Sequence, residues 1–384
     1  MNEEGHGGIE KNRIYWMDNL RSFMIFLVVL LHTGLVYESS GIVASFWIVD
    51  DPSTNDWSGI INLIIDISAM PTIFLISGFL APLSLRQKKG WTFLKSKFNR
   101  LMIPWVVAVL TLLPLYKVIF LYSRGLPQEN WTTYFHWSNG IWSQNWLWFL
   151  PVLFLFNMLY LFFSRLDIEI SGLTLKRVIT AAFLISLIST HCVDMFNGQG
   201  WTKTILIDFQ NERLLIYFMA FLVGSFCYKL RSFDSKVGSK KLYTLVGCSV
   251  WIPMCLYLFL VIYSLIRPGE YIFSGMVDLF AIRLSFLASS LTVMYLLINT
   301  FRYYLDKQGH IGRVLNRNSY HVYIVHVVVM GGVALTILDT TIPSLLKYLI
   351  VTVSTYTVSN LLISAYGKIK KLRISFRSLK YRRV

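Results

Sequence analysis

The segment DNLRSFMIFLVVLLHTGLVY, residues 18–37, decides the fold class of this chain. After Arg21 it contains no Asp, Glu, Lys or Arg as far as Tyr37. About 20 predominantly apolar residues are enough to cross the hydrocarbon core of a bilayer as an α-helix. The segment also lacks the small-residue cleavage pattern that ends a secretory signal peptide. We therefore predict that it is a retained first membrane helix.

Long apolar stretches recur along the rest of the chain and predict ten membrane helices in all. The connections between them are brief, so no soluble domain is inserted. We predict an all-α, polytopic membrane domain over residues 20–366, between an N-terminal segment (1–19) and a basic tail (367–384). The predicted spans are 20–38, 59–82, 101–122, 146–164, 178–195, 213–228, 242–266, 279–301, 319–338 and 345–366. The sixth is short, and it is expected to begin earlier or to insert at an angle.

The composition favours a membrane protein over a nucleic-acid-binding protein. Of the 384 residues, 55% are hydrophobic and only 15% are charged, against roughly 25% charged residues in soluble domains. The net charge of +16 comes from short basic runs between apolar stretches, not from one basic surface. The four cysteines lie in or beside apolar stretches without paired spacing. They indicate buried thiols, with neither a disulfide framework nor a metal site.

The distribution of charge predicts the orientation of the chain. If the N-terminus is cytoplasmic, the inner segments hold 29 of the 36 Lys and Arg residues and the outer loops hold 5. Basic residues concentrate on the cytoplasmic side of membrane proteins. We therefore expect both termini to be cytoplasmic, with the basic tail bound to anionic lipid at the membrane surface.

Arg21 and His32 are the clearest functional candidates, because ionisable side chains at membrane depth mark functional sites. Eleven positions separate them, which is about three helical turns, so both point from one face about 16 Å apart. An extended donor could place phosphates at Arg21 and a reactive carbonyl near His32. Imidazole suits proton abstraction from a hydroxyl, because it titrates near neutral pH. The alternative is that neither residue is functional: an Arg at the membrane interface and a His that bonds a neighbouring helix would show the same spacing.

Six further short motifs follow one another along the chain. They are RIYWMDNLR (13–21), FLISGFL (74–80), KFNRLMIP (97–104), NWLWFL (145–150), YFMAFLVG (217–224) and SYHVYIVH (319–326). With them, the chain resembles the family 3 transmembrane acyltransferases, whose first helix carries an Arg, ten residues and then a His. The order of the motifs carries this resemblance, which extends from residue 13 to about 330. Within the family, the short chain is most similar to the glucan-modifying succinyltransferase branch.

The resemblance implies a multi-pass enzyme of the cell membrane that transfers an acetyl or succinyl group. The implied donor is cytoplasmic acyl-coenzyme A (acyl-CoA), a co-substrate and not a bound cofactor, and the implied acceptor is a hydroxyl of an exported or cell-surface glycan. By motif, His32 is the catalytic residue, while Arg21 and Arg100 contact the donor phosphates, which Arg binds bidentately. Asp18 either orients Arg21 one turn later or caps the start of the helix.

Four other ionisable residues are weaker candidates. Asp66, in the second span, could pair with His32 or Arg283, or form a polar bond between helices. Glu38, near the outer mouth, could position an acceptor hydroxyl or be an inert interfacial residue. Tyr323 and His326 lie one turn apart in the ninth span, where they either line the same tunnel as His32 or simply pack.

The outer segment WTTYFHWSNGIWSQNWLWF, residues 131–149, is rich in aromatic residues. Trp and Tyr rings offer apolar faces on which a sugar ring can lie, with polar neighbours such as His136, Asn139 and Gln144. An aromatic belt at the membrane interface would have the same composition. The segment therefore predicts either a sugar platform or an interfacial belt.

Two other functional classes compete with the enzyme. A transporter or proton-coupled channel could use His32, Asp66, Arg283 and His326 as a relay. Transporters are often built from related halves, and the chain has no detectable internal repeat. A structural scaffold would leave the intramembrane charges without a role. We therefore favour the enzyme.

The predicted topology can be tested by labelling Thr54→Cys, which lies close to Asp50 in the first outer loop. An impermeant thiol reagent added to intact cells should label this variant above the level of the unmodified protein. Ser96→Cys, in the basic loop, should be labelled only after lysis. The opposite pattern would invert the orientation.

Overall fold

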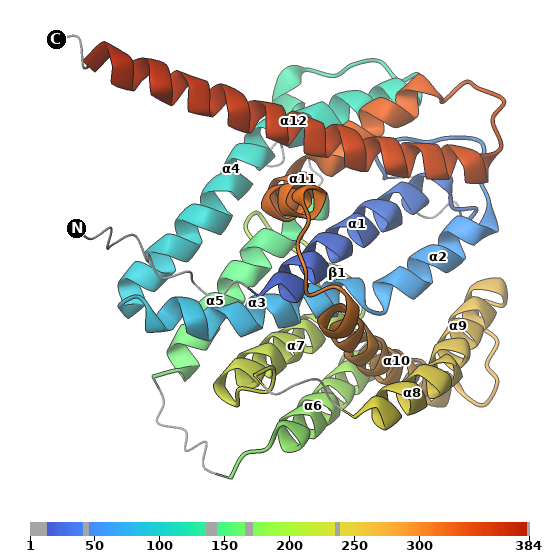
Figure 1. The fold of residues 1–384 in the computed structure, drawn as a ribbon. Coiled ribbons are helices and arrows are strands. Elements are labelled where there is room, and N and C mark those ends of the chain that lie inside the picture. The colour runs from blue at the N-terminus through green and yellow to red at the C-terminus, as the bar shows by residue number, and fades with distance from the viewer. Residues whose placement is uncertain (1–13, 41–45, 136–143, 166–171, 235–238, 382–384) are drawn as a thin grey trace, which may run out of the picture.

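The computed structural model describes residues 14–40, 46–135, 144–165, 172–234 and 239–381. Helices form almost all of this part of the chain (Figure 1). The α-helices are α1 (Tyr15–Tyr37), α2 (Asp56–Asp66), α3 (Ala69–Arg86), α4 (Gly90–Ser123), α5 (Phe149–Phe163), α6 (Leu175–Met195), α7 (Asn211–Lys229), α8 (Lys240–Ser249), α9 (Trp251–Ile266), α10 (Gly275–Tyr304), α11 (His310–Thr336) and α12 (Ser344–Tyr381). Two short 3₁₀ helices, η1 (Trp131–Tyr134) and η2 (Asn145–Trp148), precede α5. Strands β1 (Trp201–Thr202) and β2 (Phe209–Gln210) pair antiparallel before α7.

Nine helical segments of the described chain are long and apolar enough to cross a membrane. They coincide with nine of the ten predicted spans and confirm an all-α, polytopic membrane protein. The sixth predicted span corresponds to α7, which begins at Asn211 and carries Glu212 and Arg213 in its first turn. These polar residues shorten its apolar part. It still forms a 19-residue helix that packs on α3 and α6.

Two of the predicted spans are each divided into two helices, and proline explains both breaks. Pro71 lies in the first turn of α3, directly after the break from α2. Pro253 lies in the first turn of α9, directly after the break from α8. Proline has no N–H to donate to the carbonyl four residues earlier, so the helical ladder is interrupted at Ile67 and Ser249.

Helices α3 and α7 approach closely because each presents a glycine to the backbone of the other. A Cβ atom on Gly78 would lie 1.8 Å from the Phe221 carbonyl oxygen, and one on Gly224 would lie 2.0 Å from that of Leu75. Small residues let membrane helices bring their backbones together. The α3–α7 pair therefore forms a fixed unit, and α1 contacts the α3 side of it.

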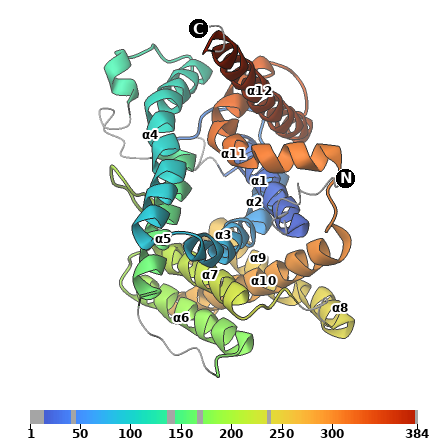
Figure 2. The ribbon, with the colours of Figure 1, turned by 60° about the vertical axis from the view of Figure 1, so that its left-hand side comes forward.

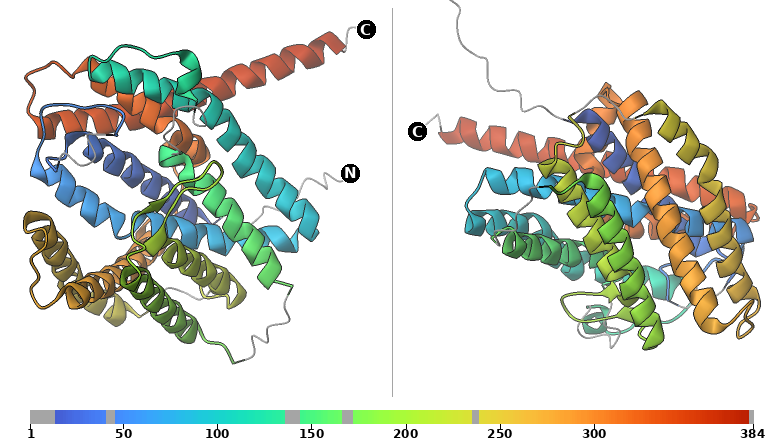
Figure 3. Two further views of the ribbon diagram at one scale, coloured as in Figure 1. Left: turned by 180° about the vertical axis from the view of Figure 1, so that it is seen from behind. Right: turned by 90° about the horizontal axis from the view of Figure 1, so that it is seen from below.

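Helix α1 lies among five other helices and positions the candidate site. It contacts α2, α3, α10, α11 and α12, and Figure 2 shows α1, α11 and α12 gathered on the side opposite α4. Beyond α3 and α7 lie α6, α8, α9 and α10, while the end of α12 extends away from the other helices (Figures 1 and 3). We call the two ends of the bundle the Arg21 end and the Glu38 end, after the residues that α1 brings there.

Ion pairs join distant parts of the chain and correct one prediction. They link Lys347 to Asp51 (3.0 Å), Arg283 to Asp194 (2.8 Å) and Arg213 to Asp66 (2.7 Å). Of the two interpretations of Asp66, the pairing with His32 or Arg283 is therefore wrong, and the polar contact between helices is the one that the structure has. The Arg283 guanidinium already donates to both carboxylate oxygens of Asp194. Asp66 is instead neutralised by Arg213 at the start of α7.

Candidate active site

The His32 imidazole lies near the Glu38 end of α1 and is enclosed by two other rings. Its Nδ1 atom lies 2.8 Å from Nε2 of His326 on α11. The Trp47 indole stacks on it with ring centroids 5.2 Å apart, and the Trp47 Nε1–H donates to the His32 carbonyl at 3.1 Å. His326 itself is fully buried. The two imidazoles therefore form one unit inside the bundle.

The hydrogen bonds of this pair indicate which nitrogen atoms carry protons. His326 Nδ1 lies 2.6 Å from the Tyr323 backbone carbonyl, which can only accept, so His326 Nδ1 donates. In a neutral His326, Nε2 must then accept, and His32 Nδ1–H is its donor. His32 Nε2 keeps its lone pair in this arrangement. It is therefore the nitrogen that can act as a base or a nucleophile.

Tyr323 and Trp146 fix the part of α11 that carries His326. The Tyr323 hydroxyl donates to the Trp146 carbonyl, and the Trp146 Nε1–H donates to the Ile324 carbonyl at 2.9 Å. Both side chains are buried. Such reciprocal bonds hold the backbone carbonyl that orients His326 in a fixed position.

Arg21 lies eleven residues before His32, and both side chains reach α11. The Arg21 guanidinium lies 3.1 Å from the Asp18 carboxylate and donates to the Asn316 carbonyl at 3.2 Å. The Asn316 side chain accepts from Ser22 and donates to Asn19. The N-cap position of α1 is Ile14, so Asp18 takes the first of its two expected arrangements, the contact with Arg21.

A cavity of about 370 Å³ lies between α1, α3, α4, α5 and α11 at the Arg21 end. Four of its lining side chains are basic: Arg21, Lys97, Arg100 and Arg317. Its remaining wall is mostly apolar and aromatic, and includes Ile25, Leu101, Phe149, Leu153 and Tyr323. The cavity therefore combines a cationic rim with an apolar interior. That combination suits a ligand with phosphates at one end and a less polar arm at the other.

The lining of this cavity does not extend to His32 in the described part of the chain. Ile25 lines it, and His32 lies seven residues further along α1, about 10 Å at 1.5 Å per residue. Tyr323 connects the two regions, since its side chain lines the cavity and its carbonyl bonds His326. Tyr323 therefore lies between the two ends of the predicted tunnel, but the cavity does not reach from Arg21 as far as His32.

Other ionisable candidates lie apart from the imidazole pair. Glu38 lies in the turn after α1, where it accepts from the Ser40 hydroxyl and its backbone bridges to Asn55. His321 is exposed and packs edge-on against the Tyr320 ring. In the ranges that the structure describes, no group of three His, Cys, Asp or Glu side chains could hold a metal ion.

The described parts of the aromatic outer segment, residues 131–135 and 144–149, do not form one exposed platform. His136 and Asn139 lie outside the described residues. Gln144 is fully buried: its side-chain oxygen accepts from the Trp105 indole N–H and its backbone N–H donates to Asp208, while Trp146 is only 1% exposed. The inclusion of Gln144 in a sugar platform is therefore wrong, because its side chain is bonded inside the bundle. Trp131, in contrast, is 67% exposed.

Several residues of the site were not predicted from the sequence. Trp47 covers His32 from a loop, and Asn316 holds Arg21 from α11. Lys97 lies three residues before Arg100 on the same face of α4, a spacing that could have indicated it. Arg317, in the basic connection before the ninth span, carried no signal beyond its charge.

Comparison with known proteins gives a family for the chain. The family model described as "Acyltransferase domain" matches residues 14–364, nearly the whole chain. Proteins called "Glucans biosynthesis protein C" from Salmonella paratyphi B, Salmonella heidelberg and Salmonella schwarzengrund are 30% identical to it over 148 residues. That match covers 37% of this chain and 36% of each relative, so the chain spans about a third of their length. No solved structure matches.

The extent of the family match confirms the resemblance that the sequence motifs indicated. It covers the helix that carries Arg21 and His32, the residues that line the basic cavity, and the α11 residues Asn316 and His326 that bond Arg21 and His32. The chain therefore belongs to the family 3 acyltransferases and is a membrane-embedded transferase enzyme.

Proposed function

We propose that this enzyme transfers an acyl group from acyl-CoA, bound from the cytoplasm, to a hydroxyl of an exported or cell-surface glycan. The observation that carries the proposal is the basic cavity at the Arg21 end, with the His32–His326 pair beyond it on the same two helices. The cavity suits an anionic donor, and the imidazole pair suits proton transfer. On the predicted topology, the cavity faces the cytoplasm and the imidazole pair lies toward the other side.

The charge and the lining of the basic cavity support the binding of acyl-CoA there. Arg21, Lys97, Arg100 and Arg317 converge on one cavity from α1, α4 and α11. Arginine binds phosphate through paired N–H donors, and lysine adds a compact positive charge. Coenzyme A carries its phosphates at the nucleotide end and its thioester at the end of a flexible arm. The arm would extend past Tyr323 toward His32, about 16 Å from Arg21 along α1.

The proposed chemistry uses the lone pair of His32 Nε2. This nitrogen takes the proton of the acceptor hydroxyl while the hydroxyl oxygen attacks the thioester carbonyl carbon. The tetrahedral adduct collapses as the carbon–sulfur bond breaks, and the protonated His32 returns the proton to the coenzyme A thiolate. The products are the glycan ester and the free thiol. His326 positions His32, because its bond to His32 Nδ1 becomes charge-assisted when His32 is protonated.

A second form of the mechanism makes His32 the nucleophile. His32 Nε2 would attack the thioester carbonyl carbon directly and expel the coenzyme A thiolate. The acceptor hydroxyl oxygen would then attack the acyl carbon, the carbon–nitrogen bond would break, and the hydroxyl proton would balance the thiolate. We favour the general base, because a path between two compartments lets donor and acceptor meet directly. Trapped acyl label on the protein without an acceptor would distinguish the two forms.

The acceptor class is proposed from the relatives. Their name refers to glucan biosynthesis, and a glucan offers many hydroxyl groups. The acyl group is acetyl or succinyl. The exposed ring of Trp131 and the edge-to-face pair of Trp148 and Trp201 supply aromatic surface near the loops of the predicted outer side.

The transporter alternative has less support than the acyltransferase. It required His32, His326, Asp66 and Arg283 to act as one relay. Asp66 and Arg283 are each bound in an ion pair of their own, with Arg213 and Asp194. The imidazole pair alone does not form a path across the membrane.

Arg21→Ala is expected to weaken the binding of acyl-CoA. Loss of a charge-assisted phosphate contact costs about 1.5–3 kcal/mol, or about ten- to hundredfold in affinity. Calorimetric titration of the detergent-solubilised protein would measure this change. Arg267→Ala, an exposed arginine whose pair with Glu270 lies at the opposite end, serves as the matched control. Equal donor affinity in the two folded variants would remove the role of Arg21.

His32→Ala is expected to slow transfer strongly but to keep donor binding. Loss of acid–base catalysis lowers the rate by roughly 10²–10⁴-fold, while the donor cavity does not include this side chain. The assay measures thiol release in the presence of acceptor. His321→Ala, an exposed histidine near the other end of the same bundle, is the control. Transfer at the unmodified rate by His32→Ala would exclude both forms of the mechanism.

The positioning role of His326 is tested by two substitutions. His326→Gln keeps an acceptor for His32 Nδ1–H, whereas His326→Leu removes it. We expect the leucine variant to lose kcat by about 10²-fold or more, with an unchanged KM for the donor, and the glutamine variant to recover part of that loss. Equal kcat values in the two folded variants would show that His326 only fills space.

A further inference from the structure

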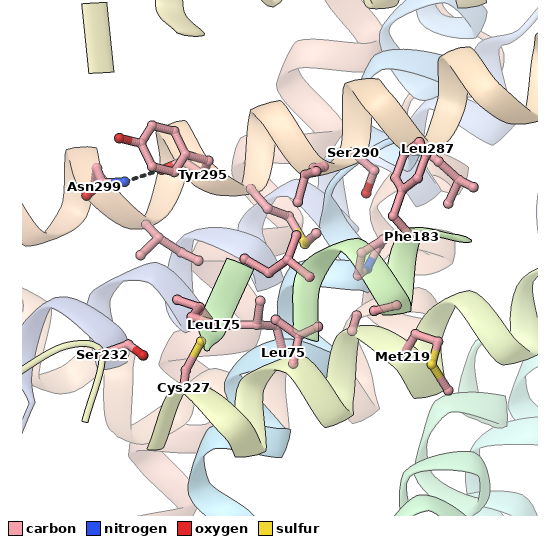
Figure 4. A pocket seen from close by; sticks show the side chains of 18 of the residues that line it. Leu75, Leu175, Phe183, Met219, Cys227, Ser232, Leu287, Ser290, Tyr295 and Asn299 are labelled. Carbon is pink, nitrogen blue, oxygen red and sulfur yellow. Dashed lines mark hydrogen bonds between the residues drawn. The ribbon is translucent and has the colours of Figure 1, made fainter. Parts of the chain in front are cut away.

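A second cavity, of about 350 Å³, lies between α3, α6, α7, α8 and α10. Figure 4 shows it between α7 and α10, with Asn299 and Tyr295 toward one end and Leu287 and Met219 toward the other. It shares no lining residue with the basic cavity in the described part of the chain. Helix α3 separates the two, since it gives Leu75 to one and Ile76 to the other. The second cavity is therefore a distinct site.

The cavity is long and follows the helix axes. Its lining on α10 extends from Leu287 to Arg302, which is about 22 Å at 1.5 Å per residue. Its lining on α6 extends from Leu175 to Ser186. Half of a bilayer is about 15 Å of hydrocarbon, or about 20–22 Å with its headgroup region. The cavity therefore has the length and direction of one lipid in one leaflet, headgroup included.

The walls of the cavity change character along its length. Most of the lining is hydrocarbon or thioether, from side chains such as Ile179, Phe183, Ile216, Met219, Leu291 and Met294. Polar side chains gather at one end, where Ser232, Ser239, Asn299 and Arg302 line it. Toward the Leu287 end the lining includes two serines, Ser186 and Ser290, and the Ser290 hydroxyl has no hydrogen-bond partner among the described residues. An occupant with one polar head and a long apolar tail matches this gradient.

The polar end is also the basic end. The Arg302 guanidinium donates to the Phe233 carbonyl at 3.4 Å and lies 5.1 Å from the centre of the Phe233 ring. The chain beside it carries Lys229, Arg231, Lys240 and Lys241 against Asp234, and a second acid, Asp306, interacts electrostatically with the Arg302 guanidinium. On the predicted topology this end faces the cytoplasm, where the leaflet surface is anionic. Guanidinium binds phosphate well, so the head that complements this end is an anionic phosphate.

We propose that this cavity binds an anionic phospholipid of the cytoplasmic leaflet, with an acyl chain between α6, α7 and α10 and its phosphate at Arg302. The acyl chain of the lipid gains van der Waals contacts with the apolar side chains that line the cavity. The occupant rests against the α3 face opposite the basic cavity, so it supports the helix that separates the two cavities. This site does not depend on the transfer chemistry proposed above.

The test uses the full-length protein reconstituted in vesicles of phosphatidylcholine that contain phosphatidylglycerol with a diazirine on one acyl chain. After irradiation, mass spectrometry locates the labelled peptides. We expect labels on residues that line the cavity, including Met219, Leu287 and Met294. The same diazirine on phosphatidylcholine should label the exposed lipid-facing residues instead. Equal labelling of the cavity by both lipids, or labels confined to exposed faces, would overturn the proposal.

Two matched pairs of variants sharpen the test. Ala182→Phe fills the cavity, whereas Ala181→Phe adds the same ring at an exposed position one residue away. Arg302→Gln removes the proposed phosphate contact, and Arg313→Gln removes an exposed arginine at the same end. We expect cavity labelling to be lost in the first pair only with Ala182→Phe, and to fall about tenfold in the second pair only with Arg302→Gln.

Equal labelling within either pair of folded variants would contradict the proposal. If Ala182→Phe or Arg302→Gln does not yield monodisperse protein, the comparison of the two lipids on the unmodified protein decides. That comparison needs no variant. Labelling that is specific to phosphatidylglycerol and located in the cavity supports the site, and any other pattern refutes it.

Discussion

Inside a bilayer, a polar side chain can be satisfied only by other parts of the protein, and α1 and α11 meet this requirement together. Arg21 and Ser22 bond Asn316 near one end of the two helices, and His32 bonds His326 near the other. These contacts set both the distance and the register between α1 and α11. Every element of the proposed site depends on that register, because the basic cavity and the imidazole pair are both built across it.

The ion pairs elsewhere in the bundle lie apart from the contacts between α1 and α11. Asp66 and Asp194 each lie against a basic partner from another helix, and Asp51, in the loop before α2, lies against Lys347 of α12. A buried charge without a partner would cost several kcal/mol, so each acid is tied to a fixed place. None of these ion pairs includes His32 or His326. The imidazole pair is instead oriented by neutral groups, the Tyr323 carbonyl and the Trp47 indole.

Helix α3 has a comparable role between the two cavities. Gly78 and Gly224 bring α3 and α7 into backbone contact, which fixes the wall that both cavities share. On one side α3 faces the basic cavity, and on the other it faces the long apolar cavity. An occupant of the apolar cavity therefore acts on the same helix that shapes the donor site.

The sequence by itself determined the membrane fold, the family and the shared face of Arg21 and His32, because long apolar stretches and helical periodicity are local properties. It did not determine the partners of the buried charges. Asp66 meets Arg213 and not His32, and Gln144 lies inside the bundle and not on a platform, because neighbours in a helical bundle come from distant segments. The pairing of His32 with His326 joins residues 294 positions apart. Only the packing of α1 on α11 could bring those two imidazoles within hydrogen-bonding distance.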